Sequence, residues 1–130
     1  PYISFMGMLP PDKADSMLVQ ADVLVHMGNT TPEMLPSKIL DYINTGKPII
    51  NLYQHDHCPT LSILDAYPLK LNIRVDSPVT DELLNNIVSF CKENYRKRIS
   101  YDEIKSLYMK YTPKVVGEIF YNTLLEVSKK

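Results

Sequence analysis

The fold is decided by one stretch of the sequence, Asp22 to Ile50, which runs DVLVHMGNTTPEMLPSKILDYINTGKPII. It opens with an almost continuous apolar run over 22–27, which is typical of a strand covered on both faces. A polar loop then leads to a helix over 36–45, which ends at Gly46. A second buried strand is expected over 48–53. A strand, a helix and a strand in this order predict a parallel sheet.

The rest of the chain extends this pattern on both sides. Strands are expected over 2–6 and 69–75, and helices over 10–21, 59–67, 80–94, 100–111 and 113–130. The predicted fold class is therefore α/β, a doubly wound, Rossmann-like parallel sheet with a C-terminal helical tail. Because the first residues already have the character of a strand, we expect the chain to start in mid-fold, as part of something longer.

Composition and charge narrow the class of protein. The chain has 130 residues, 45% hydrophobic and 22% charged, which suits one folded domain with a single core. A formal net charge of −1 gives no field that would attract nucleic acid. Cys58 and Cys91 form no CxxC unit, so a reducing, cytoplasmic setting is expected. The basic run over 92–98 is interpreted as a solvated helix end, or as a contact with the inner face of a membrane.

The start of the helix over 36–45 has the character of an anion site. Pro36 at the first helical position loses no hydrogen bond, and the N–H groups of Ser37 and Lys38 lie at the positive end of the helix dipole. Asp41 lies one turn further along, on the face of Ser37, where it suits a ribose diol. Glu33, in the loop before the helix, would reach the other side of the anion. A nucleotide diphosphate sugar has this form.

A purely structural interpretation explains the same residues and is favoured on spacing alone. Asp41 would pair with Lys38 on a solvated helix face, and Glu33 would favour the positive helix end. Gly46 and Pro48 would then form an ordinary helix stop.

The stretch resembles the donor-binding segment of the retaining GT-B glycosyltransferases, a large family that includes sucrose synthases and bacterial mannosyl- and polysaccharide-building transferases. That family carries Ala-Asp-Val before a strand, a loop acid, a second acid after seven intervening residues, and Gly-Lys-Pro before the next strand. The matching positions here are 21–23, Glu33, Asp41 and 46–48. The resemblance covers about residues 2–55, since the strand, glycine and helix expected before Asp22 fit as well.

The resemblance implies a role for each matching position. It assigns Glu33, Met34 and Leu35 to the donor sugar, Pro36, Ser37 and Lys38 to the pyrophosphate, Asp41 to the ribose, and Met8 to the base. Two positions depart from the family pattern: Asp41 is one methylene shorter than the usual Glu, and Pro36 lacks an N–H donor.

The implied reaction is retaining transfer of a sugar from a nucleotide diphosphate donor to an acceptor hydroxyl, in surface polysaccharide biosynthesis. Residues 1–130 would be the C-terminal donor-binding domain of a hexosyltransferase, inactive without its N-terminal acceptor domain and that domain's cations. The expected partners are the nucleotide sugar, an acceptor glycan or lipid-linked glycan, and the N-terminal domain. No metal, cofactor or nucleic acid is expected. The apolar stripe of the last helix (Val116, Phe120, Leu124 and Val127) favours self-association.

Other interpretations stay open beside this one. Half of a sugar-nucleotide epimerase would share the donor contacts. A flavodoxin-like regulatory module is less favoured, since the acids that a receiver needs after its first strand are missing from 2–11. The run His55 to Cys58 contains metal-ligand residue types, but four consecutive residues cannot all reach one ion. His26 stands alone in the sequence. His55 or His57 is instead expected to line the crevice toward the acceptor.

Overall fold

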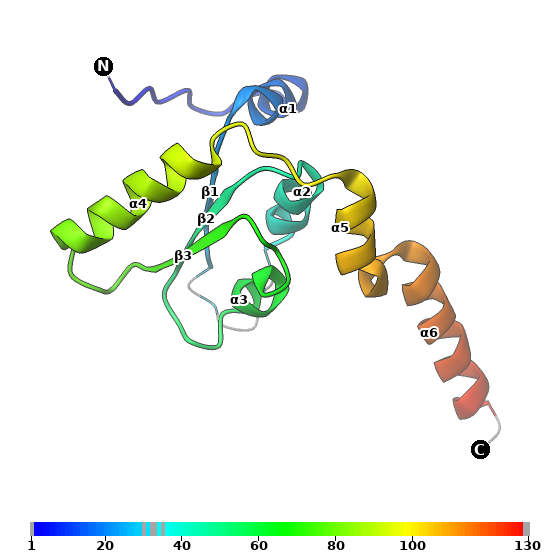
Figure 1. Ribbon diagram of the computed structural model, residues 1–130. Coiled ribbons are helices and arrows are strands. Elements are labelled where there is room, and N and C mark those ends of the chain that lie inside the picture. Colours follow the sequence, from blue (N-terminus) through cyan, green and yellow to red (C-terminus); the bar gives the residue numbers. More distant parts are fainter. Residues whose placement is uncertain (1, 30, 32–33, 35, 129–130) are drawn as a thin grey trace.

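The computed structural model describes residues 2–29, 31, 34 and 36–128 (Figure 1). Its elements are α1 (Pro11–Gln20), β1 (Leu24–Met27), α2 (Lys38–Asn44), β2 (Ile49–Tyr53), α3 (Pro59–Leu64), β3 (Lys70–Arg74), α4 (Asp81–Asn94), α5 (Tyr101–Leu107), the 3₁₀ turn η1 (Met109–Tyr111) and α6 (Pro113–Val127). The α/β fold class is confirmed, with a small parallel sheet at its centre and a run of helices after β3.

The sheet has the order β1-β2-β3, and both pairings are parallel. Leu24 on β1 lies opposite Ile49 on β2, which lies opposite Lys70 on β3. β2 is central and buries its first three residues, as its apolar sequence predicts. β3 lies at an edge, in agreement with its more alternating sequence. Since all three strands are parallel, their carboxyl ends lie side by side at one end of the sheet.

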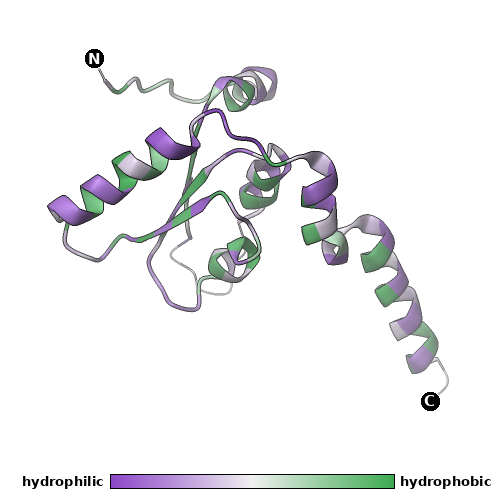
Figure 2. Cartoon of the chain, in the orientation of Figure 1, coloured by the Kyte–Doolittle hydropathy of each residue, from purple (hydrophilic) through white to green (hydrophobic). Residues whose placement is uncertain are grey.

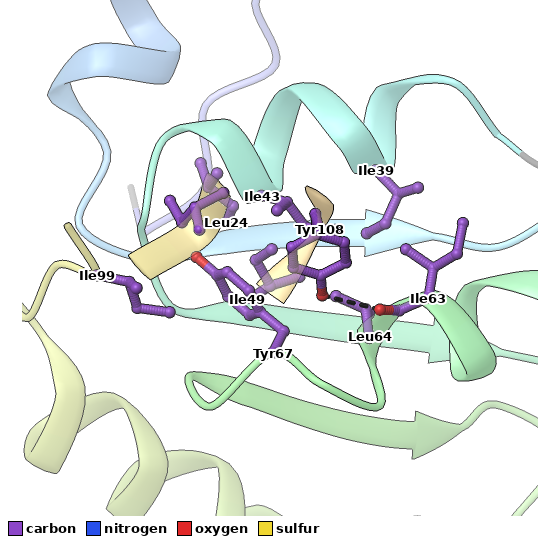
Figure 3. Packing of buried hydrophobic residues seen from close by; sticks show 10 residues of the cluster. Leu24, Ile39, Ile43, Ile49, Ile63, Leu64, Tyr67, Ile99 and Tyr108 are labelled. Atoms are coloured by element: carbon purple, nitrogen blue, oxygen red, sulfur yellow. Dashed lines mark hydrogen bonds between the residues drawn. The ribbon is translucent and has the colours of Figure 1, made fainter. Parts of the chain in front are cut away.

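One side of the sheet carries the hydrophobic core, shown in Figure 3. The cluster combines residues of β1, β2, α2, α3 and α5 with three residues from connecting segments: Leu24, Ile39, Ile43, Ile49, Ile63, Leu64, Tyr67, Ile99, Ile104 and Tyr108. Each fully buried isoleucine or leucine contributes about 1.5–3 kcal/mol relative to an exposed one. The two tyrosines satisfy their hydroxyls, since Tyr67 donates to the carbonyl of Lys47 (2.7 Å) and Tyr108 to that of Ile63 (2.8 Å). Burial raises the pKa of Tyr108 to about 12.

Two expectations about the sheet were wrong. Residues 2–6 form no strand, and the side chains of Tyr2, Ile3 and Phe5 are exposed. A strand needs a hydrogen-bonded neighbour, and none of the three described strands pairs with this segment. β1 is also not covered on both faces: its burial alternates, and Val25 and Met27 are 52% and 75% exposed. An apolar run does not by itself supply the second layer that would bury it.

The junction between α2 and β2 is tied down at several points. Gly46 has a φ of +70°, as predicted for a helix stop, and its carbonyl accepts a hydrogen bond from the N–H of Ile99 (2.8 Å). The buried amine of Lys47 donates to the carbonyls of Leu18 and Val19 in the last turn of α1. Burial lowers the pKa of Lys47. The Gly-Lys-Pro segment therefore ends one helix and caps another.

The later helices begin where the sequence predicts. Thr80 accepts a hydrogen bond from the N–H of Leu83 at the start of α4, and Ser100 does the same for Glu103 at the start of α5. α6 projects away from the sheet (Figure 1), and apolar residues recur along it (Figure 2). Among the described residues, no helix combines the length and apolar character that crossing a membrane requires.

Candidate functional site

The loop after β1 leaves the sheet at the carboxyl ends of the strands. Ligands of open parallel sheets bind outside these ends, at a switch in strand order, and the three described strands contain no such switch. The N–H of Gly28 donates to the carbonyl of Leu52 at 2.8 Å, so the chain leaves β1 while still bonded to β2. A Cβ atom at position 28 would lie 2.9 Å from the same carbonyl oxygen. Gly28 is therefore required for this close approach. Sequence reasoning missed it, although a glycine directly after an apolar run is a visible signal.

The described part of the loop is folded by short-range hydrogen bonds. The Asn29 side-chain amide donates to the carbonyl of Met34 (3.4 Å), and the N–H of Met34 donates to the carbonyl of Thr31 (3.3 Å). Met34 itself is exposed. Glu33 and Leu35, two of the three residues expected to meet the donor sugar, lie outside the described residues.

The helix starts two residues later than expected. Ser37 is the N-cap of α2 and Lys38 its first residue, so Pro36 precedes the helix and is not its first residue. The difference arises because Ile39 bonds the carbonyl of Pro36 (3.2 Å) and Leu40 that of Ser37 (3.1 Å), which makes a tight turn ahead of the regular helix. Ser37 and Lys38 are nevertheless exposed at this helix start, where the dipole is positive.

Lys38 and Asp41 lie together on the surface of α2. The Lys38 Nζ is 3.5 Å from Asp41 Oδ2, and the two side chains are 73% and 56% exposed. This is the contact that the purely structural interpretation predicts. An exposed pair of this kind contributes between zero and about 1 kcal/mol, so it opposes the binding of another group only weakly.

Both residues also line a cleft of about 370 Å³ between α1 and α2. Its other lining residues are Ala14, Asp15, Leu18, Tyr42 and Asn44. The volume lies within the range of small-ligand sites, and the walls combine carboxylates and an amine with the ring of Tyr42. Asp41 and Lys38 thus help to line a cleft large enough for part of a nucleotide.

Met8, the residue expected to contact the base, is fully exposed and is not among the lining residues of this cleft. It lies in the segment before α1, just after Gly7, which has a φ of +66°. Its expected role remains a prediction.

A second cluster of charged residues lies at the carboxyl edge of β2 and β3. Arg74, the last residue of β3, donates to both carboxylate oxygens of Asp76 (2.7 and 3.1 Å) and to Asp56 in the loop after β2 (2.6 Å). These bonds raise the pKa of Arg74, and the bond from Arg74 lowers the pKa of Asp76. His55 and His57 are exposed beside Asp56. Sequence reasoning missed the cluster, because 18 positions separate Arg74 from Asp56.

A row of polar side chains crosses the middle of the three strands; it is buried at His26 and Asn51 and exposed at Asn72. His26, Asn51 and Asn72 occupy matching register positions. His26 Nδ1 lies 3.0 Å from Asn51 Oδ1, and the Asn51 amide donates to Asn72 Oδ1, also at 3.0 Å. Because Asn51 Oδ1 can only accept, the imidazole carries a proton on Nδ1. The ring also meets Tyr42 of α2 edge-on, with centroids 6.2 Å apart. The histidine that stands alone in the sequence is therefore part of a satisfied core network.

Within the described ranges, no three His, Cys, Asp or Glu side chains gather in a way that could hold a metal ion. Comparisons with protein-family models, with curated proteins and with solved structures found no match to this chain.

Proposed function

We propose that this chain binds a nucleotide diphosphate sugar, as the donor-binding half of a retaining GT-B glycosyltransferase. The observation that carries the proposal is the position of Lys38 and Asp41. They follow the loop at the carboxyl end of a parallel strand and share one cleft, which runs along α2 beside α1. A cation for phosphate and a carboxylate for hydroxyl groups are thus adjacent at the edge where such folds bind nucleotides.

On ligand binding, the salt bridge between Lys38 and Asp41 would break, and each side chain would contact the ligand instead. The Lys38 amine would turn to the diphosphate, together with the hydroxyl and N–H of Ser37. The carboxylate of Asp41 would accept hydrogen bonds from the ribose diol. Since the pair is exposed, giving it up costs little, and the two charge-assisted contacts to the ligand would more than offset that cost.

The remaining parts of the proposal rest on the sequence resemblance. Glu33, Met34 and Leu35 would meet the donor sugar, Pro36 would shape the turn beside the pyrophosphate, and Met8 would approach the base. The three described strands would belong to a doubly wound, Rossmann-like sheet, which is one half of a GT-B fold. Transfer to an acceptor hydroxyl, with retention at the anomeric carbon, needs the acceptor domain and its cations.

Titration calorimetry on the full chain tests the proposal. Uridine, guanosine and adenosine diphosphates are each titrated into the wild type, Asp41→Asn and the matched control Asp102→Asn, which alters an acid in the first turn of α5. We expect at least one diphosphate to bind, and Asp41→Asn to weaken it by about 1–3 kcal/mol while Asp102→Asn leaves it unchanged. Lys38→Ala should weaken the same ligand and make the remaining affinity less sensitive to salt. If neither Asp41→Asn nor Lys38→Ala changes the affinity for the diphosphate, the proposal is contradicted.

A further inference from the structure

α6 presents an apolar seam that the described chain does not cover. Val116, Phe120, Thr123 and Val127 recur at spacings of four, three and four residues, which are the seam positions of a coiled coil. Ile119 and Leu124 flank this seam on either side. Among these, Phe120 is 66% exposed and Val127 is 67% exposed, and no residue of α6 is buried.

The connection to α5 holds α6 away from the domain. A single residue, Thr112, separates η1 from Pro113, whose ring fixes its φ. Thr112 is hydrogen-bonded on both sides: its N–H and its hydroxyl donate to the carbonyl of Met109 (3.1 and 2.8 Å), and its carbonyl accepts from the N–H of Val116 (3.0 Å). α6 is directed away from the sheet (Figure 1), and none of its residues is buried in this arrangement.

Gly117 points to the kind of surface that covers the seam. It lies in the interior of α6, where glycine destabilises a helix relative to alanine. Within the described chain nothing requires it, because a Cβ at this position would meet no atom within 4 Å and no positive φ is recorded for it. A glycine beside an apolar seam allows another backbone or a large side chain to approach closely.

We propose that α6 pairs antiparallel with α6 of a second copy of this chain. In that arrangement Val116 faces Val127 of the second copy, and Phe120 faces Thr123 of the second copy. The flank that carries Gly117 and Leu124 meets its own equivalent, so Leu124 of each copy lies over Gly117 of the other. The register that aligns the two seams therefore also places the Leu124 side chain in the space beside Gly117.

The area suits a weak dimer. The exposed parts of the apolar side chains along the seam and its flanks sum to on the order of 500 Å² per copy, or roughly 1,000 Å² for the pair. This upper bound lies below the roughly 1,200–2,000 Å² of stable specific interfaces, in the range of weak and transient contacts. We therefore expect a monomer–dimer equilibrium with a Kd of about 10–100 μM, in which the two-fold contact is closed and does not grow into fibres.

Sedimentation equilibrium on the full chain, combined with substitutions in α6, tests the pairing. Phe120→Ser should raise the dimer Kd at least tenfold, whereas the matched control Tyr121→Ser, on the neighbouring exposed position outside the seam, should change it less than twofold. Gly117→Ala distinguishes the proposed pairing from non-specific hydrophobic association. The substitution should increase the helicity measured by circular dichroism and nevertheless raise the dimer Kd. A monomer at all concentrations up to about 500 μM, or a dimer that Gly117→Ala leaves intact or strengthens, would overturn the proposal.

Disulfide trapping tests the antiparallel register independently of affinity. In a Cys91→Ser background, with Cys58 buried, Val116→Cys and Val127→Cys chains are mixed and oxidised. The proposal expects the mixed disulfide to form at least tenfold more than either homodisulfide. Dominant homodisulfides would indicate parallel pairing and overturn the proposed arrangement.

Discussion

α2 and α6 show how differently one chain stabilises two helices. α2 has only seven residues, yet Ile39 and Ile43 are 0% and 2% exposed, and its end is fixed by the contact between Gly46 and Ile99. α6 is about twice as long, with fifteen residues, and none is buried. The stability of α2 comes from the side chains that pack against it. The stability of α6 comes from its own backbone hydrogen bonds and, in the proposed dimer, from α6 of the second copy. Helix length alone therefore says little about which helix the fold needs.

The largest expected difference follows from truncating one side chain in each helix. Ile39→Ala removes a fully buried side chain from the core and should lower the free energy of unfolding by about 2–5 kcal/mol. Phe120→Ala should lower that of the monomer by less than about 0.5 kcal/mol, because its ring is mostly exposed. Urea denaturation at a concentration below the dimer Kd measures both. Equal losses would show that α6 is part of the core.

An alanine at Gly46 should have the next largest effect. A Cβ there would collide with the carbonyl oxygen of Ile99, and the φ of +70° is itself unfavourable for a residue with a side chain. Together these should cost about 2 kcal/mol or more. Gly117→Ala is the matched control, since no neighbour meets its Cβ, and it should stabilise the monomer by up to about 1 kcal/mol. Two substitutions of the same kind should therefore have opposite signs in urea denaturation.

The smallest effect should come from the ion cluster at the sheet edge. The bond from Arg74 lowers the pKa of Asp76, so the folded state favours the ionised carboxylate. The stabilisation is present above the usual carboxyl pKa of about 4 and is lost as the pH falls through the lowered value. Between pH 5 and pH 2 the urea midpoint of the wild type should fall slightly more than that of Asp76→Asn. A larger fall for Asp76→Asn would show that Arg74 does not hold this carboxylate when the chain folds.

Local features of this chain were predictable from its sequence, and features that depend on distant neighbours were not. The helix caps at Thr80 and Ser100 and the stop at Gly46 involve residues within a few positions of one another, so the sequence contains the whole signal. Alternation along 69–75 likewise indicated an edge strand. The strand expected over 2–6 failed because β-prone residues need a partner to pair with, which no local pattern reveals.

The candidate site likewise contains local contacts, which the sequence predicts, and contacts between distant positions, which it does not. The salt bridge between Lys38 and Asp41 follows from helical spacing, so the sequence predicts it. The polar row from His26 through Asn51 to Asn72, and the contact of Arg74 with Asp56, depend on how the parallel strands are paired. That pairing brings together residues about 20 positions apart, and a single sequence carries no mark of it.

The most direct test of the central claim compares two substitutions against two ligands. The nucleoside diphosphate that binds the chain and its glucose conjugate are titrated by calorimetry into the wild type, Asp41→Asn and Glu33→Gln. We expect Asp41→Asn to weaken the binding of both ligands, since both contain the ribose. Glu33→Gln should weaken only the nucleotide sugar, because the diphosphate has no hexose for this carboxylate to hold. Each loss should be about 1–3 kcal/mol. Equal and negligible effects of the two substitutions on both ligands would contradict the claim that this edge of the sheet binds a sugar donor.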